Sequence, residues 1–147
     1  MYILDTDHLS LLEHRGSFNR QLLLNKLAVV ASDGVAATIV SFEEQMRGRL
    51  AFLAKSRIID RQIEGYERFR NQLDNYCLMA VLDFDIRAAS QFQELKSQQL
   101  RVGTMDLKIA AIVLANNAVL LSRNLVDFRR VPNLNVEDWI SQLQVTE

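Results

Sequence analysis

Four acidic residues, Asp5, Glu44, Asp106 and Asp127, carry the chemistry that this sequence suggests. They are spread over more than a hundred residues, and each stands beside a predicted strand end or the start of a predicted helix. Carboxylates are the ligands that hard divalent cations prefer, and such a cation can activate water for attack on a phosphodiester. If the fold brings these side chains together, they predict a Mg²⁺ or Mn²⁺ site that cleaves phosphodiester bonds.

Such a cluster of carboxylates requires a compensating cation. Two negative charges held about 4 Å apart repel each other by roughly 4 kcal/mol at an effective dielectric constant of about 20. A bound divalent ion offsets this repulsion. We therefore expect one or two metal ions to accompany the convergence of the acids.

Each acid also has a purely structural interpretation. The run from Ser41 to Glu44 fits a capping box, in which Ser41 begins a helix and Glu44 accepts a hydrogen bond from the Ser41 N–H. Asp106 lies where a helix N-terminus favours negative charge. Asp127 fits a turn residue and Asp5 fits a helix cap. The four positions taken together favour the metal site.

Other polar residues near the predicted strand ends leave alternatives open. Asp7 either joins the metal site beside Asp5 or caps the first helix. Asp83 and Asp85 follow a predicted strand and are interpreted as the cap of the next helix. His8 and His14 lack the spacing of a metal pair or of a catalytic triad, so a solvent-facing or core role is predicted for them.

The positions of the acids depend on a predicted alternation of strands and helices. Short apolar runs rich in branched residues alternate with longer segments of helical period, which indicates a parallel sheet with helices on both faces. The predicted strands are 2–4, 35–40, 78–82, 118–121 and 135–136. The first predicted helix begins after residue 5 and ends at residue 12. The other predicted helices are 18–30, 44–54, 59–73, 86–100 and 104–115. In such sheets, ligands collect beyond the carboxyl ends of the strands, where all four acids are expected.

Length and composition predict a single domain over residues 1–147, with a helical hairpin inserted at 43–76. The first ten residues, MYILDTDHLS, indicate a buried strand and not a signal peptide. No run reaches the roughly 18 apolar residues that a membrane span needs. We therefore expect a cytoplasmic protein that makes no contact with a membrane.

The charge of the chain is unevenly distributed. The net charge is -1, which argues against indiscriminate binding to polyanions, but residues 47–70 carry a local excess of basic side chains. Arg47 and Arg49 in this segment are candidates for contacts with RNA phosphates. The alternative is a solvated helix face stabilised by pairs such as Glu64 with Arg68.

Four motifs resemble the PIN-domain family, and in particular its VapC-type ribonuclease toxins. They are YILDTD at 2–7, IVSFEEQMRG at 39–48, GTMDLKIAA at 103–111 and LSRNLVDF at 121–128. The spacing of the second motif selects Glu44 over Glu43 as its acid. Asp7 stands where this family usually has Asn, and Ser122 replaces a more frequent Thr but keeps the hydroxyl.

The resemblance implies a PIN-like three-layer α/β/α domain with a central parallel sheet of four to five strands. It also implies Mg²⁺- or Mn²⁺-dependent cleavage of RNA, a homodimer, and a cognate antitoxin as partner. The residues that it assigns are Asp5, Glu44, Asp106 and Asp127 as catalytic metal ligands, supported by Thr6, Asp7, Ser122 and Asn124. Either Asp127 or Asn124 completes the site.

The sequence thus predicts a metal-dependent endoribonuclease that acts as the toxin of a type II toxin–antitoxin pair. The alternative is a PIN module that binds RNA or a partner protein without catalysis, and that uses the helical hairpin as its docking surface.

Overall fold

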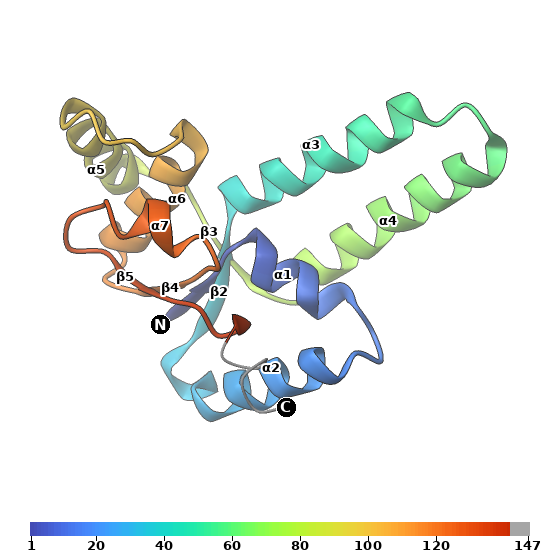
Figure 1. The fold of residues 1–147 in the computed structure, drawn as a ribbon, viewed down its shortest axis with the longest axis horizontal. Helices are drawn as coiled ribbons and strands as arrows, with labels where there is room; N and C mark the ends of the chain where they lie inside the picture. Colours follow the sequence, from blue (N-terminus) through green and yellow to red (C-terminus); the bar gives the residue numbers. More distant parts are fainter. Residues whose placement is uncertain (142–147) are drawn as a thin grey trace.

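A single parallel sheet organises the computed structural model, which describes residues 1–141. The strands lie in the order β3-β2-β1-β4-β5, and every pair of neighbours is parallel. Their bounds are Tyr2–Leu4 for β1, Val35–Thr38 for β2, Ala80–Leu82 for β3, Val119–Leu121 for β4 and Asn135–Glu137 for β5. The predicted parallel sheet is therefore confirmed, with five strands (Figure 1).

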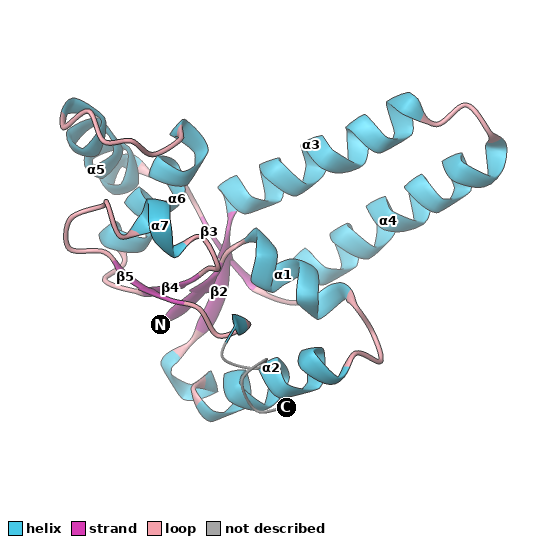
Figure 2. Ribbon diagram, in the orientation of Figure 1, coloured by secondary structure: helices cyan, strands magenta, loops and turns pink. Residues whose placement is uncertain are grey.

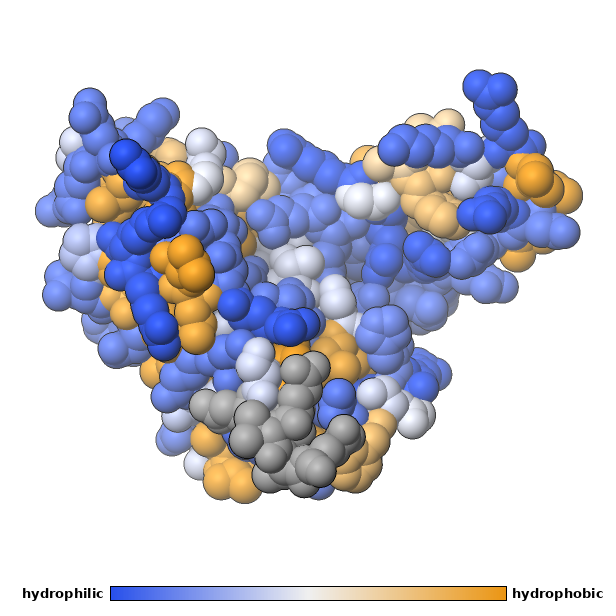
Figure 3. All heavy atoms as spheres, viewed as in Figure 1, coloured by the Kyte–Doolittle hydropathy of each residue, from blue (hydrophilic) through white to orange (hydrophobic). Residues whose placement is uncertain are grey.

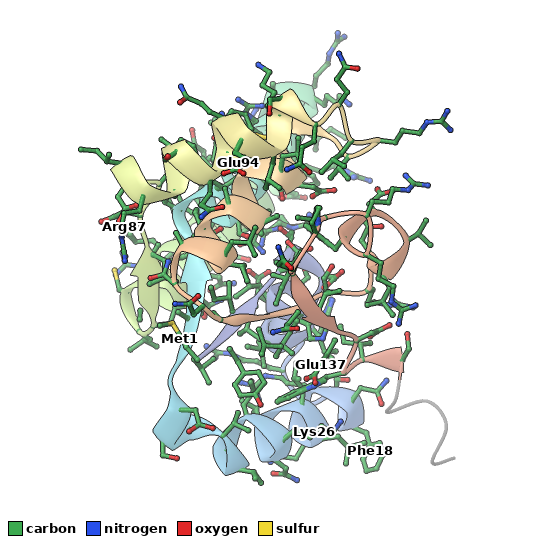
Figure 4. The ribbon with its side chains drawn as sticks, turned by 90° about the vertical axis from the view of Figure 1, so that its left-hand side faces the viewer. Met1, Phe18, Lys26, Arg87, Glu94 and Glu137 are labelled. Atoms are coloured by element: carbon green, nitrogen blue, oxygen red, sulfur yellow. The ribbon has the colours of Figure 1, made fainter. Side chains whose placement is uncertain are left out.

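Helices cover both faces of this sheet (Figure 2). Their bounds are Thr6–Glu13 for α1, Phe18–Val29 for α2, Ile39–Lys55 for α3, Ile59–Cys77 for α4, Ile86–Ser97 for α5, Thr104–Ala115 for α6 and Leu125–Phe128 for α7, with a 3₁₀ turn at Ala31–Asp33. In the side view, the strands lie between α5, which carries the labelled Arg87 and Glu94, and α2, which carries Lys26 (Figure 4). The predicted three-layer α/β/α fold is confirmed.

The central strands are apolar on both faces, as expected of a sheet covered on both sides. Ile3 of β1 pairs with Leu120 of β4, and both contribute to the core beneath α5 and α6. The next pair, Leu4 with Leu121, points to the opposite face and packs with α1 and α2. This alternation follows from the two-residue period of a strand. The parallel pairing of β1 with β4 places their carboxyl ends next to each other.

Helix α6 has the predicted bounds, Thr104–Ala115. Its residues 109–113 are completely buried, as expected of a helix that is apolar on all sides. The packing of this helix against α5 and the sheet holds its first turn, which contains Asp106, near the carboxyl edge.

The predicted end of the second strand and the capping box at Ser41 are both wrong. Strand β2 ends at Thr38, whose hydroxyl accepts a 3.0 Å hydrogen bond from the Ser41 N–H, so Thr38 is the N-cap of α3. Ile39 and Val40 belong to the first turn of that helix. Periodicity does not separate a short apolar strand from the first turn of a buried helix, because both are apolar runs. Glu44 is therefore not part of a capping box.

Smaller differences concern the ends of elements. Strand β3 begins at Ala80 because α4 continues to Cys77, and the hairpin covers α3 and α4 from residue 39 to residue 77, beyond the predicted 43–76. The short helix α7 was not predicted. Asp85 caps α5 as predicted, since its carboxylate accepts a hydrogen bond from the Ala88 N–H.

The hairpin extends away from the sheet as two long helices side by side (Figure 1). They approach closely at Gly65, where an added Cβ would overlap the side chain of Leu53 in α3. Across residues 1–141, no helix combines the length and the apolar character that a membrane span requires.

Candidate acidic site

The centre of the site is Asp5, which immediately follows β1. Its backbone N–H bonds to the Leu121 carbonyl, and its carboxylate oxygen Oδ2 accepts a 2.8 Å hydrogen bond from the Ser122 hydroxyl. Residues 117 positions apart in the chain therefore meet because β1 and β4 are neighbours. Asp5 is only 7% exposed and Ser122 is completely buried. The register between β1 and β4 therefore determines that the Asp5 carboxylate lies beside Ser122.

The pKa of the Asp5 carboxyl is raised from 3.8 to about 7, chiefly by burial. The negative charge of Asp7 contributes to this rise, and Asp106 makes a smaller contribution. Hydrogen bonds from the Thr6 backbone and from Ser122 act in the opposite direction but do not cancel the effect. A cation beside Asp5 would favour its charged form.

Glu44 reaches the same edge from α3. The Thr6 hydroxyl donates a 3.0 Å hydrogen bond to the Glu44 oxygen Oε2. Thr6 directly follows Asp5, so this contact ties the end of β1 to the second turn of α3. The hydroxyl of Thr6 thus holds the Glu44 carboxylate, and a role of Thr6 in supporting a metal site stays a prediction.

Asp106 and Asp127 meet through Asn124. The Asn124 side-chain amide donates to Asp106 Oδ2 at 3.2 Å and to Asp127 Oδ2 at 3.1 Å. The pKa of Asp106 is raised, first by burial and then by the charges of Glu44 and Asp127. Asn124 thus lies between the acid of α6 and the acid of α7.

Asp127 also forms an ion pair that the sequence interpretation missed. The Arg130 guanidinium lies 3.1 Å from Asp127 Oδ1. The two residues are three positions apart, a spacing at which side chains in a helical turn commonly pair. Arg130 partly neutralises Asp127, which distinguishes this acid from Asp5 and Asp106.

Asp7 is bound to the loop after β4 and does not cap α1. Its Oδ2 accepts a 2.9 Å hydrogen bond from the Arg123 N–H, and its Oδ1 lies 2.7 Å from His8 Nδ1. His8 is fully buried, and its Nε2 accepts from the Trp139 N–H at 3.2 Å. Of the two roles predicted for His8, solvent-facing or core, the structure shows the core role. Asp7 contributes negative charge near Asp5 and helps to hold the loop that contains Ser122 and Asn124.

The donor set suits a hard cation, although a closed cage is not preformed. Within residues 1–141, no three carboxylate, imidazole or thiol groups are arranged to hold a metal ion. The four acids are instead held by Ser122, Thr6 and Asn124, whose hydroxyl or amide groups donate to them. Carboxylates without a cation repel one another, so a spread arrangement is the expected one. Oxygen-only donors fit Mg²⁺ or Mn²⁺.

The two candidate RNA-binding arginines of α3 have different surroundings. Arg47 is exposed and pairs with Glu43 one helical turn earlier. Arg49 is four-fifths buried and pairs with Glu13 of α1 through a 2.6 Å contact. The alternative pair Glu64–Arg68 is also present, at 2.7 Å.

The carboxyl ends of β1, β2 and β4 point toward a hollow in the surface. Figure 3 shows this hollow between the hairpin and the lobe that contains α5, α6 and α7, and the atoms along it are mainly hydrophilic.

Comparisons with known proteins find chains that are similar in sequence and in fold. No protein-family model matches the chain. It is 32% identical over 78 residues to ribonuclease VapC2 of Rickettsia felis and 30% identical over 89 residues to the tRNA(fMet)-specific endonuclease VapC of Salmonella typhimurium. These alignments cover 50% and 58% of this chain, and 58% and 63% of the two relatives. The chain therefore matches less than two thirds of the length of each relative.

Solved structures share the fold over almost the whole chain. VapBC2 of Rickettsia felis, bound to a DNA fragment from its promoter, superposes with a TM-score of 0.71 at 24% identity, covering 94% of this chain and 98% of that one. VapBC-1 of nontypeable Haemophilus influenzae gives a TM-score of 0.72 at 22% identity, with coverages of 94% and 97%. VapBC-5 of Mycobacterium tuberculosis, a member of the VapBC family of toxin–antitoxin systems, gives 0.54 at 21% identity, with coverages of 92% and 94%. The resemblance to VapC-type members of the PIN-domain family, first drawn from four motifs, is thus confirmed by both sequence likeness and fold.

Proposed function

We propose that this protein is a divalent-metal-dependent endoribonuclease and the toxin of a type II toxin–antitoxin pair. The observation that carries the proposal is the convergence of acids from β1, α3, α6 and α7 at one polar edge. The raised pKa values of Asp5 and Asp106 support it, because burial first, and then the neighbouring acids, disfavour the charged carboxylates, and a bound cation would relieve both effects. The sequence likeness to proteins named as VapC ribonucleases supports the choice of RNA.

We assign distinct tasks to the residues of the site. Asp5, Glu44 and Asp106 hold the cation, and Asp127 or Asn124 completes its surroundings. Mg²⁺ or Mn²⁺, when bound, supplies a Lewis acid that lowers the pKa of water and neutralises charge developing on the phosphate. Thr6 and Ser122 hold the carboxylates in orientation.

We also propose that a cognate antitoxin covers this protein, that two copies form a homodimer, and that both act in the cytoplasm. The antitoxin is supported by the solved neighbours, which are VapBC assemblies. The homodimer rests on the family resemblance. Cytoplasmic action follows from the proposed RNA substrate.

A PIN module that binds RNA or a partner without catalysis is the second candidate. The observation in its favour is that no three-ligand metal group is preformed in the described part of the chain. The two candidates differ in whether Mg²⁺ binds at the acids.

The test compares Asp106→Asn with Asp74→Asn, an exposed acid of α4 that serves as a control with the same charge change. With Mg²⁺ and an RNA stem-loop as substrate, we expect Asp106→Asn to lose about 10³-fold in cleavage rate, equivalent to roughly 4 kcal/mol of transition-state stabilisation. The control should cleave like the wild type.

A thermal-shift measurement with Mg²⁺ separates the two candidates without a substrate. Binding to the folded state alone raises the melting temperature, so Mg²⁺ should stabilise the wild type and the Asp74→Asn control but not Asp106→Asn. Equal shifts in all three proteins, together with undiminished cleavage by Asp106→Asn, would exclude the assignment. A wild type that neither cleaves RNA nor responds to Mg²⁺ would favour the binding module.

A further inference from the structure

An arginine-rich pocket lies apart from the acids, between α1 with its following loop and the C-terminal half of α4. Its volume is about 640 Å³. We call it the arginine pocket and define it by Arg15, Arg20, Arg49, Arg68 and Glu13, which all line it. Asn71 and Asn75 of α4 add amide groups to its wall.

The charge of the pocket differs from that of the whole chain. Four arginines face a single acid among the described lining residues, Glu13, which leaves a net charge of +3, whereas the whole chain carries -1. An excess of positive charge in a concave surface attracts an anion. The planar guanidinium fork fits phosphate oxygens two at a time.

Contacts with the fold hold three of these four arginines in place. Arg20 Nε donates to the Leu12 carbonyl at 2.7 Å, and Arg49 pairs with Glu13. The Arg49 Nε is buried and has no hydrogen-bond partner in the described structure. Arg68 pairs with Glu64 and stacks over the Phe52 ring at 4.4 Å. Guanidiniums held in this way lose little conformational freedom when an anion binds.

The pocket neighbours the acidic site. Arg49 follows Glu44 by five positions in α3, which corresponds to about 7.5 Å along the helix axis. Tyr76 of α4 is near both sites, because the charges of Glu13 and Arg49 act on its hydroxyl together with those of Glu44 and Asp5. One RNA strand is long enough to contact both places at once.

We propose that the arginine pocket binds a backbone phosphate of the same RNA whose cleaved bond lies at the acids. The proposal rests on the proposed ribonuclease function for the identity of the polymer. The pocket then acts as a second point of attachment that sets which bond reaches the acids. An acidic peptide is the competing occupant, since the wall next to Arg20 also contains Leu12 and Leu78.

Binding measured without catalysis tests this proposal. A fluorescein-labelled RNA stem-loop is titrated with protein in EDTA over a series of KCl concentrations. The double variant Arg15→Ala/Arg68→Ala should bind about 10-fold more weakly at low salt. Its slope of log affinity against log salt should be shallower by roughly 0.7 for each single-strand phosphate that the variant no longer neutralises. Arg57→Ala/Arg61→Ala, which removes the same charge from the far end of the hairpin, should stay within twofold of the wild type.

Several outcomes would overturn the proposal. The first is that Arg15→Ala/Arg68→Ala binds RNA with the same affinity and the same salt slope as the wild type. Another is an equal decrease of affinity in both double variants, which would indicate nonspecific attraction. A third is unchanged RNA binding with weakened binding of a synthetic peptide of alternating Leu and Glu, which would assign the pocket to a protein partner.

The same variants separate this proposal from the nuclease function. If the protein cleaves RNA, Arg15→Ala/Arg68→Ala should raise KM and leave kcat within twofold, because the pocket does not touch the reacting phosphate. If the wild type does not cleave RNA, the proposed function fails, while the EDTA titration still decides whether the pocket binds RNA.

Discussion

The acidic edge and the helical hairpin are built in opposite ways. At the acidic edge, Asp5 bonds to Ser122 across 117 positions, and Thr6 bonds to Glu44 across 38 positions. In the hairpin, Arg68 pairs with Glu64 and Arg70 with Asp74, each only four positions apart. The first set is buried or partly buried, and the second is exposed to water.

The two sets of contacts differ in how much folding free energy is lost when one partner is removed. A buried polar group that loses its partner retains the full cost of its removal from water. An exposed ion pair contributes little, because water and salt compete for both charges. The acidic edge should therefore be sensitive to single changes and to pH, while the hairpin should tolerate changes on its exposed face.

The largest predicted effect that tests this comparison is the dependence of the unfolding free energy on pH at the acidic edge. Because the pKa of Asp5 is raised to about 7 in the folded state, the native protein binds more protons than the unfolded protein between pH 3.8 and 7. The stability that this group contributes is present below pH 3.8 and is lost as the pH rises toward 7. Between pH 5 and pH 8 the metal-free protein should lose about 3 kcal/mol of unfolding free energy through Asp5.

Urea unfolding in EDTA at pH 5 and pH 8 measures this loss. Asp5→Asn should remove the greater part of it, and Asp74→Asn in the hairpin should leave it unchanged. A wild type and an Asp5→Asn variant with the same difference between the two pH values would show that the Asp5 carboxyl is not the group responsible.

The next effect comes from the hydroxyl that holds Asp5. Ser122 donates to Asp5 Oδ2 at 2.8 Å and accepts from the Asn124 N–H at 3.0 Å. Ser122→Ala leaves both partners without this hydroxyl at a buried position, so we expect a loss of about 2 kcal/mol in urea unfolding.

Ser122→Thr keeps the hydroxyl and should recover more than half of this loss. Ser97→Ala removes an exposed hydroxyl that donates to the Glu94 carbonyl within α5, and it should change the stability by less than about 0.5 kcal/mol. If Ser122→Ala were as stable as the wild type, the hydrogen bond would not be what holds Asp5 at the edge.

The smallest effect is expected in the hairpin. Arg70 and Asp74 lie 3.2 Å apart, with side chains that are 76% and 57% exposed. A double-mutant cycle with Arg70→Ala and Asp74→Ala should give a coupling energy of about 0.3 to 0.5 kcal/mol. A coupling above about 1 kcal/mol would contradict the contrast between the two regions.

The local apolar pattern was sufficient to predict the bounds of elements that consist of one continuous apolar run. The bounds of β1 and α6 agree with the prediction, because Tyr2–Leu4 is a short apolar run and Thr104–Ala115 is a long one that follows Gly103. The pattern failed at β2, where Thr38 capped the helix in place of Ser41. A cap depends on the backbone conformation at a single residue, and apolar periodicity carries no information about it.

The amino-acid sequence alone determined which acids were candidates, through residue types and motif spacing. It also determined the alternation of strands and helices, because the hydrophobic period is a property of the chain. Only the tertiary structure decided how the candidates are held. It tied Asp5 to Ser122, tied Glu44 to Thr6, and placed Asn124 between Asp106 and Asp127. These contacts arise from strand order and helix packing, and a linear sequence does not encode them as any local pattern.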